Sequence, residues 1–378
     1  MPDLLIYADT GRSPEMRHEV PIGIPDAFLY VERNGSRHVV LTSFELDRIR
    51  EIAAGPEPHP YEEFGYDELL AQGLQREEVS LRVVVNACKK LGVEDAVVPP
   101  AFPIQYADRL RAEGVEVRPD HETFATRRRV KNAVELAGIR RAQRAAEAGM
   151  DAARGLLRRA ESNGAALTVD GEPLTAERIK LAINEVFAAH GMVADEFIVS
   201  HGAQSAVGHN MGSGPISRGE SIVIDLWPKD AETACYADMT RTYVVGDPSD
   251  EVVEFHRLCK EALDRSLEAI RAGVPGRDVF QLVCELFHEA GQPTQLSKKP
   301  GEVLEDGFYH GLGHGVGLEV HESPWLGRGP GEMVAGDVVT VEPGLYRHGT
   351  GGVRLEDLVL VTADGAENLT DYPYDLTP

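Results

Sequence analysis

Hydrophobic and polar positions alternate in short runs over the first third of the chain, and these runs predict strands and helices in turn. Strands are expected at residues 27–32, 38–42, 96–98 and 115–117, and a helix at 104–112. The first two strands flank Asn34-Gly35, a dipeptide typical of tight hairpins. This part of the chain therefore predicts a small α/β domain.

After Pro119 and the basic run at residues 127–129, the pattern changes to long stretches of good helix formers. Helices are expected at 131–160, 175–190, 250–272 and 277–290, and strands at 196–200, 221–227, 240–245, 338–341 and 353–361. Thr175 is a candidate N-cap for the second helix. Two helices followed by strands, twice over, predict a catalytic domain of two similar halves. We expect an α+β protein with domains at 1–125 and 126–378.

Composition narrows the range of partners. The chain has 378 residues, of which 42% are hydrophobic, and a formal charge of -24. That excess of acid repels nucleic acid and anionic membranes. The N-terminus shows no signal peptide and no apolar run is long enough to span a membrane, so we expect a cytoplasmic protein. The four cysteines are scattered and fit core positions better than a metal site.

Two carboxylates occur in apolar segments where burial is costly without a partner. Asp225 lies inside the strand predicted at 221–227, and Asp238 stands near the start of the next strand. Residues 228–234 are predicted to be the loop of a hairpin that turns about Ala231 and Glu232, which brings Asp225 roughly opposite Asp238. One hairpin is thus expected to present two carboxylates together.

The second half supplies a matching pair. Glu342 ends a predicted strand, and Glu356 stands in the middle of the strand predicted at 353–361. Between the two pairs of acids, His310, His314 and His321 lie within a glycine-rich apolar stretch. Three histidines so close together in such a stretch indicate a site, because the glycines permit close approach of the backbone.

Charge indicates how many ions these groups would hold. Four carboxylates around one dication leave a net negative charge in a pocket of low dielectric, whereas two dications bring the sum close to neutral. Oxygen ligands with an imidazole and no thiolate favour manganese or cobalt, with zinc or iron as alternatives. Two metals about 3.5–4 Å apart can activate a water for amide hydrolysis. The sequence offers no HExxH motif, no GxSxG elbow and no GxxxxGK phosphate loop.

These motifs resemble the pita-bread metallopeptidase family of prolidase, aminopeptidase P and methionine aminopeptidase. The matching elements are Asp225, Ala-Asp238-Met-Thr-Arg-Thr, His310-Gly-Leu-Gly-His314-Gly-Val-Gly-Leu-Glu-Val-His321-Glu, Val-Glu342-Pro-Gly-Leu-Tyr and Val-Arg-Leu-Glu356-Asp. The likeness covers roughly residues 126–365 and includes an entry helix with Arg128, Lys131 and Glu135. It implies a creatinase/prolidase-like N-terminal domain and a pseudo-two-fold catalytic domain.

The resemblance also implies a role for each site residue. Asp238 and Glu356 would bridge two metals, Asp225 would bind one metal, and His314 and Glu342 would bind the other. Glu342 would also shuttle the proton to the leaving nitrogen. Substrate would be held by a group of four side chains: His209, His310, His321 and Arg354. His201 has no counterpart in the family, and we expect it to be structural.

The separate N-terminal domain favours the proline-specific branch, whose members are commonly homodimers that cut short proline-containing peptides before the proline. Three departures concern substrate choice: a longer loop between Asp225 and Asp238, Trp227 in place of a small residue, and an extra loop at 297–306. They leave open a non-peptide amide hydrolase of the ectoine type or a small-metabolite lyase. A scaffold protein or a metal-free creatinase is disfavoured, since all five ligand positions are present.

Overall fold

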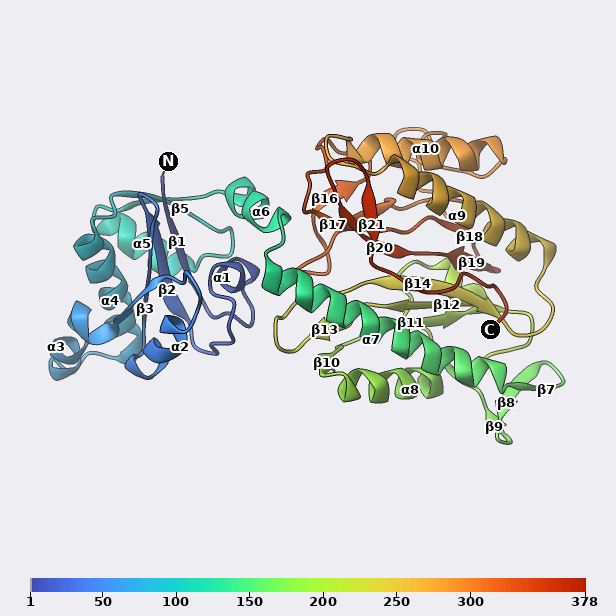
Figure 1. Cartoon of the computed structure of the whole chain (residues 1–378), viewed down its shortest axis with the longest axis horizontal. Helices are drawn as coiled ribbons and strands as arrows, with labels where there is room; N and C mark the ends of the chain where they lie inside the picture. Colours follow the sequence, from blue (N-terminus) through green and yellow to red (C-terminus); the bar gives the residue numbers. More distant parts are fainter. Residues whose placement is uncertain (1) are drawn as a thin grey trace. The chain divides into compact units, whose positions relative to one another are not determined.

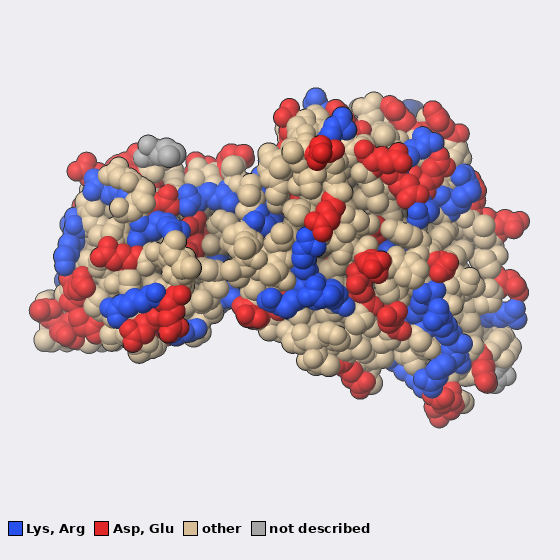
Figure 2. All heavy atoms as spheres, viewed as in Figure 1, with Lys and Arg blue, Asp and Glu red and all other residues tan. Residues whose placement is uncertain are grey.

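The computed structural model describes residues 2–378 and divides into two compact units, Met1–Arg128 and Arg129–Pro378. Acidic and basic side chains are intermixed over the face of each unit that Figure 2 shows, so the excess of acid does not gather there in a single patch. None of the helices in the described part of the chain is long and apolar enough to cross a membrane.

The first unit is a six-stranded mixed sheet with helices against both faces (Figure 1). In the order β4-β3-β2-β1-β5-β6, the strands are Glu57–Pro60, Ser36–Leu41, Phe28–Arg33, Asp3–Ala8, Asp95–Val98 and Glu116–Pro119. The helices are α1 Pro14–Glu19, α2 Leu46–Arg50, α3 Tyr66–Ala71, α4 Arg76–Leu91, α5 Ile104–Ala112 and α6 His121–Arg129. Short 3₁₀ turns occur at η1 Ser43–Glu45 and η2 Tyr61–Phe64.

Side chains along each strand point alternately to the two faces of this sheet, so each face has its own hydrophobic core. On β1, Leu5 packs with residues of α3, α4 and α5, whereas Leu4 and Ile6 pack with residues of α1, α2 and α6. The predicted hairpin is confirmed, because β2 and β3 pair antiparallel across Asn34 and Gly35, both at positive φ.

The second unit has two halves, each with two long helices and a set of strands that follows them; the first half also has β7–β9 between its helices. The first half comprises α7 Ala133–Arg158, β7 Glu161–Asn163, β8 Ala166–Val169, β9 Glu172–Pro173, α8 Ala176–Ala189, β10 Met192–Val193, β11 Ile198–His201, η3 Gly202–Ala206, β12 Ser221–Leu226, β13 Lys229–Asp230 and β14 Met239–Val244. The second half comprises α9 Asp250–Ala269, α10 Gly276–Glu289, β15 Gly313–Gly315, β16 Glu322–Leu326, β17 Val338–Val341, β18 Gly344–Arg347, β19 Gly351–Arg354, β20 Asp357–Val361 and β21 Ala366–Asn368.

Helices α7 and α8 cover the sheet β11-β12-β14, while α9 and α10 cover strands of the second half (Figure 1). Helix α8 begins at the cap that the sequence predicts, whereas the cap of α7 was not predicted. Thr175 accepts a hydrogen bond from the N–H of Arg178 at the start of α8. Asn132 and Glu135 form a capping box at the start of α7, with reciprocal bonds of 2.9–3.0 Å. The entry segment is therefore not one helix: Arg128 lies in α6, and Lys131 lies in the break before α7.

The prediction of a single strand at 353–361 is wrong. The segment forms two strands in different sheets, since β19 pairs with β18 and β20 pairs with β17. Glu356 lies between them, where its N–H donates to the carbonyl oxygen of Thr240 on β14 at 3.0 Å. The break between β19 and β20 thus contains a hydrogen bond between the two halves, and this bond fixes the backbone of Glu356 beside β14. The four cysteines are free and buried, as predicted.

Candidate active site

A pocket of about 650 Å³ opens in the second unit, and both halves contribute to its wall. Its lining includes all nine side chains that the sequence singles out: His209, Asp225, Asp238, His310, His314, His321, Glu342, Arg354 and Glu356. The fold thus brings together positions more than a hundred residues apart in the chain.

Asp225 and Asp238 come from the neighbouring strands β12 and β14. Asp225 pairs with Thr240, and Asp238 stands just before β14, so the predicted pairing of Asp225 with Asp238 is wrong by two residues. The connection is not the plain loop expected, because it contains β13, which pairs with β10. Side chains alternate along a strand, so a shift of two positions keeps both carboxylates on one face.

Glu342 and Glu356 complete the group of carboxylates from the second half. Glu342 follows β17 directly. The hydroxyl of Thr240 donates to Glu356 Oε2 at 2.7 Å and aims that carboxylate towards the residues of β14. No role was predicted for Thr240, although its position two residues after Asp238 puts it on the same strand face.

His314 on β15 presents one ring nitrogen to these acids. Its Nδ1–H donates to the carbonyl oxygen of Gly315 at 3.1 Å, which leaves Nε2 with a free lone pair. That Nε2 lies 3.8 Å from Asp238 Oδ2 and 3.6 Å from Glu342 Oε1. Burial lowers the pKa of His314 to about 3, so the ring is neutral and able to act as a ligand.

The donors fit a divalent cation. Ligand atoms of Asp238, His314 and Glu356 lie within 4.8 Å of one another. In the described part of the chain, the buried Oδ1 atoms of Asp225 and Asp238 have no hydrogen-bond partner. Burial, followed by repulsion between the neighbouring carboxylates, raises the pKa of Asp238 and of Glu356 well above the ordinary range. A bound cation would satisfy these oxygens and offset their repulsion.

Arg354 joins the carboxylate group to His310. Its Nη2 donates to Asp225 Oδ2 at 2.5 Å, and its Nη1 donates to the hydroxyl of Tyr346 at 3.1 Å. Tyr346 in turn donates to His310 Nε2 at 2.9 Å, while His310 Nδ1–H bonds to the carbonyl oxygen of Gly311 at 2.7 Å. Tyr346 ends the motif that begins at Val341, but sequence reasoning gave it no role.

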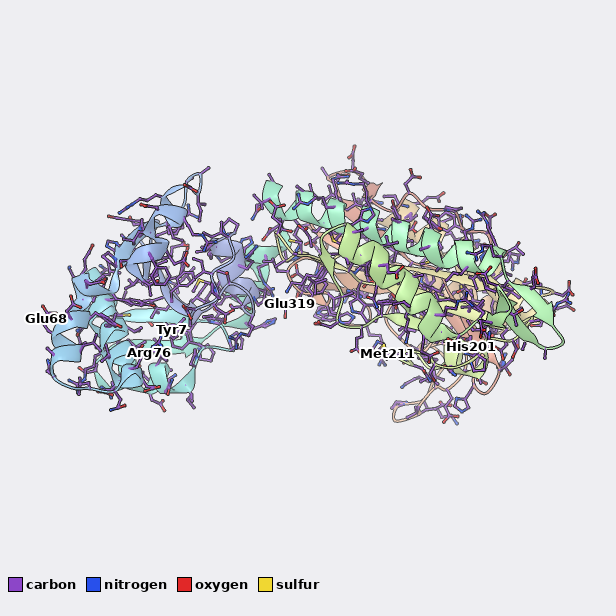
Figure 3. The ribbon with its side chains drawn as sticks, turned by 90° about the horizontal axis from the view of Figure 1, so that it is seen from below. Tyr7, Glu68, Arg76, His201, Met211 and Glu319 are labelled. Carbon is purple, nitrogen blue, oxygen red and sulfur yellow. The ribbon has the colours of Figure 1, made fainter. Side chains whose placement is uncertain are left out.

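The open side of the pocket carries His209 and His321, both exposed. The ring of His321 lies edge-on to that of His314, with centroids 4.3 Å apart. Apolar lining includes Met211 (labelled in Figure 3), Trp227, Val320 and Trp325. Trp227, whose size stood out in the sequence, therefore shapes the space available to a ligand.

His201, also labelled in Figure 3, does not line the pocket. Its Nδ1 lies 2.7 Å from Glu220 Oε2, and its Nε2 lies 3.1 Å from the carbonyl oxygen of Ser213. Both ring nitrogens are used within the scaffold, which is the structural role expected for this residue.

Comparisons with known proteins agree with this architecture. The chain is 37% identical over 183 residues to the Xaa-Pro dipeptidase of Pyrococcus furiosus, a match that covers 47% of each chain. It is 32% identical over 199 residues to the probable dipeptidase PepE of Mycobacterium tuberculosis, covering 51% of this chain and 49% of the other. The chain thus spans about half the length of the curated relatives it matches.

Solved structures extend the likeness to the whole chain. The Xaa-Pro dipeptidase of Bacillus anthracis superposes with a TM-score of 0.78 at 22% identity, covering 99% of this chain and 94% of the other. The X-Pro aminopeptidase of Thermotoga maritima gives a TM-score of 0.76 at 22% identity, covering 99% and 97%. These likenesses confirm the predicted two-domain pita-bread fold. The model of metallopeptidase family M24 matches residues 137–363, and the chain belongs to that family.

Proposed function

We propose that this protein is a metal-dependent exopeptidase that hydrolyses the Xaa-Pro amide bond of dipeptides or short peptides. One observation carries the proposal: five ligand-type side chains meet in one pocket, and two of their buried carboxylate oxygens have no partner among residues 2–378. The names of its relatives, Xaa-Pro dipeptidase and X-Pro aminopeptidase, support proline specificity.

The residues that would hold two divalent ions are Asp225, Asp238, His314, Glu342 and Glu356. Bound there, two such ions would lower the pKa of a water to near neutrality and stabilise the negative charge that develops as an amide is hydrolysed. Manganese or cobalt suits this oxygen-rich set with one imidazole.

The remaining chemistry falls to side chains of the chain itself. Glu342 would take a proton from the attacking water and pass it to the proline nitrogen as the carbon–nitrogen bond breaks. His321 and His209 line the open side, where they would hold the scissile carbonyl and the substrate. Arg354 would hold Asp225 in place by their 2.5 Å hydrogen bond, and through Tyr346 it would fix His310 at the pocket wall.

The proposal is tested by assaying metal-stripped protein on an Xaa-Pro dipeptide and an Xaa-Pro-Xaa tripeptide, before and after adding manganese or cobalt. We expect metal-dependent release of the N-terminal residue, and the preferred peptide length names the subclass. Glu342→Gln should lower kcat by about 10²–10⁴-fold, the usual contribution of general acid–base catalysis. Glu185→Gln, an exposed position on α8, is the matched control and should leave kcat unchanged.

Binding of two ions without cleavage of either peptide would contradict proline specificity. The pocket wall with Trp227 would then be tested with small amide metabolites, the substrates of the alternative hydrolase. Light scattering on the same preparation measures whether the chain is a homodimer, as the resemblance implies.

A further inference from the structure

A second group of metal-ligand side chains lies in the first unit. Ligand atoms of His38, Glu57 and His59 all fall within 4.8 Å of one another. His38 is on β3, and the other two are on β4, the edge strand of the sheet. The parallel register pairs His38 with Glu57 and Val40 with His59. Paired residues, and residues two apart on a strand, share a face, so the register itself gathers the three side chains on one side.

The distances suit a small four-coordinate ion. His38 Nδ1 lies 3.2 Å from His59 Nε2 and 3.4 Å from Glu57 Oε2. Ligands about 2.0–2.1 Å from a tetrahedral zinc ion are roughly 3.3 Å from one another. Both separations match that spacing, and ligand atoms of all three residues lie within 4.8 Å of one another, so the distances are compatible with a bound ion.

Glu63 supplies the outer contact that metal-binding histidines typically have. It lies in η2, just after β4, and its Oε2 is 3.2 Å from His59 Nδ1. A histidine that donates one N–H to a carboxylate keeps the other nitrogen free as a ligand. Here the free nitrogen is Nε2, the atom that faces His38. The edge of the Phe64 ring packs against His59, with centroids 6.0 Å apart, and helps to fix the plane of the imidazole.

A cation satisfies this group better than a proton does. Without an ion, one proton on His38 Nδ1 faces two acceptors, His59 Nε2 and Glu57 Oε2. A dication binds both imidazoles and the carboxylate at once, and Glu63 brings the charge to balance. Lys90 is the other charged group beside that carboxylate, with its Nζ 3.9 Å from Glu63 Oε2.

We propose that His38, Glu57 and His59 form a zinc site that joins the edge strand β4 to β3 and keeps one coordination position open. Two histidines and one carboxylate are a set that zinc accepts, with water or an external ligand in the fourth position. The exposed fraction of the side chain is 18% for His38, 15% for His59 and 66% for Glu57, which leaves that position on the solvent side.

The local sequence gives the ion a structural role. β4 reads Glu-Pro-His-Pro, and neither Pro58 nor Pro60 has an N–H to donate to the sheet. The strand has only four residues and pairs with β3 alone, so few backbone hydrogen bonds hold it at the edge of the sheet. A bound ion would join His38 on β3 to Glu57 and His59 on β4, and these bonds would hold the edge strand in place.

The test is the zinc content of the full chain after equilibrium dialysis, measured by mass spectrometry. His38→Gln and His59→Gln should each hold one zinc ion per chain fewer than the unmodified protein. His121→Gln, an exposed histidine of the same unit outside the group, should hold the same number. Ions in the pocket of the second unit are common to all these variants and cancel in the comparison, so the outcome does not depend on the proposed peptidase activity.

Glu63→Gln is a second test, needed because the histidine variants could lose zinc through failure to fold. It leaves all three ligands in place and should keep the full zinc count at saturation while weakening the affinity about 10–100-fold. An unchanged zinc count in both His38→Gln and His59→Gln would overturn the proposal, as would an affinity unaffected by Glu63→Gln. Far-UV circular dichroism confirms that each variant compared has kept its fold.

Discussion

Replacing Arg241 by methionine tests how the second unit holds the backbone of its site. The side chain of Arg241 on β14 is 1% exposed, and that of its partner Asp357 is 0% exposed, at 3.0 Å. The guanidinium also donates to four carbonyl oxygens at 2.7–3.0 Å, those of Thr240, Glu356, Tyr372 and Pro373. Methionine keeps much of the apolar stem and removes every donor.

The expected loss follows from these contacts. Removing one partner of a buried ion pair costs about 3–5 kcal/mol, because the other charge stays buried. Asp357 keeps hydrogen bonds from Asn368 and from the hydroxyl of Tyr374, so the lower end applies. A loss of about 3 kcal/mol lowers the melting temperature of a domain of this size by about 6–12 °C, at roughly 2–4 °C per kcal/mol.

Differential scanning calorimetry of the metal-free full chain measures the shift. The control is Arg257→Met on α9, whose side chain is 56% exposed and pairs with Glu254 and Glu261. Solvent screens exposed pairs and makes them contribute little to stability, so this variant should shift the melting temperature far less than Arg241→Met does. Equal shifts for the two variants would refute the view that Arg241 anchors the strand, the Glu356 segment and the C-terminal residues together.

Three further predictions concern the second unit. Gly138→Ala on α7 would put a methyl group 1.9 Å from Thr233 Oγ1, so we expect the free energy of unfolding to fall by about 1–3 kcal/mol. Gly155→Ala on the same helix would meet nothing within 4 Å, so the free energy of unfolding should rise by about 0.5–1 kcal/mol. Asn132→Ala removes the capping box of that helix and should cost about 0.5–2 kcal/mol by urea denaturation; no change would mean that the cap is dispensable. Adding manganese to chelator-treated protein at about 100 times its Kd should stabilise the chain by about 2.7 kcal/mol, and an unchanged melting temperature would argue against binding in the pocket.

The local sequence pattern was sufficient to predict the bounds of some elements. The helix predicted at 104–112 and the strand at 338–341 match α5 and β17 residue for residue. By contrast, α4 was not predicted. Its buried residues include Val83, Val84 and Val85, β-branched side chains that locally favour strands, and packing against the sheet decides for the helix.

Contacts between segments that are distant along the chain could not be predicted from the sequence. Residues 353–361 contain no glycine or proline that would mark the point at which the chain changes sheets. That point is set by β14, whose Thr240 binds Glu356 through both its backbone carbonyl and its hydroxyl. The hairpin of Asp225 was likewise shifted by two residues because β13 pairs with a strand outside it.

The side chains of the candidate active site could be predicted from the sequence, whereas the residues that hold them in place could not. A carboxylate in an apolar strand is conspicuous, since its burial requires a partner, and an error of two residues in register does not change its face. Thr240 and Tyr346 are ordinary strand residues until the hydrogen bonds to Glu356 and Arg354 are seen. His38 and His59 stand 21 positions apart on strands that pair in parallel, so only the register of those strands makes them neighbours. A site made by pairing of distant strands leaves no motif, and its ligands become recognisable only when the sheet is assembled.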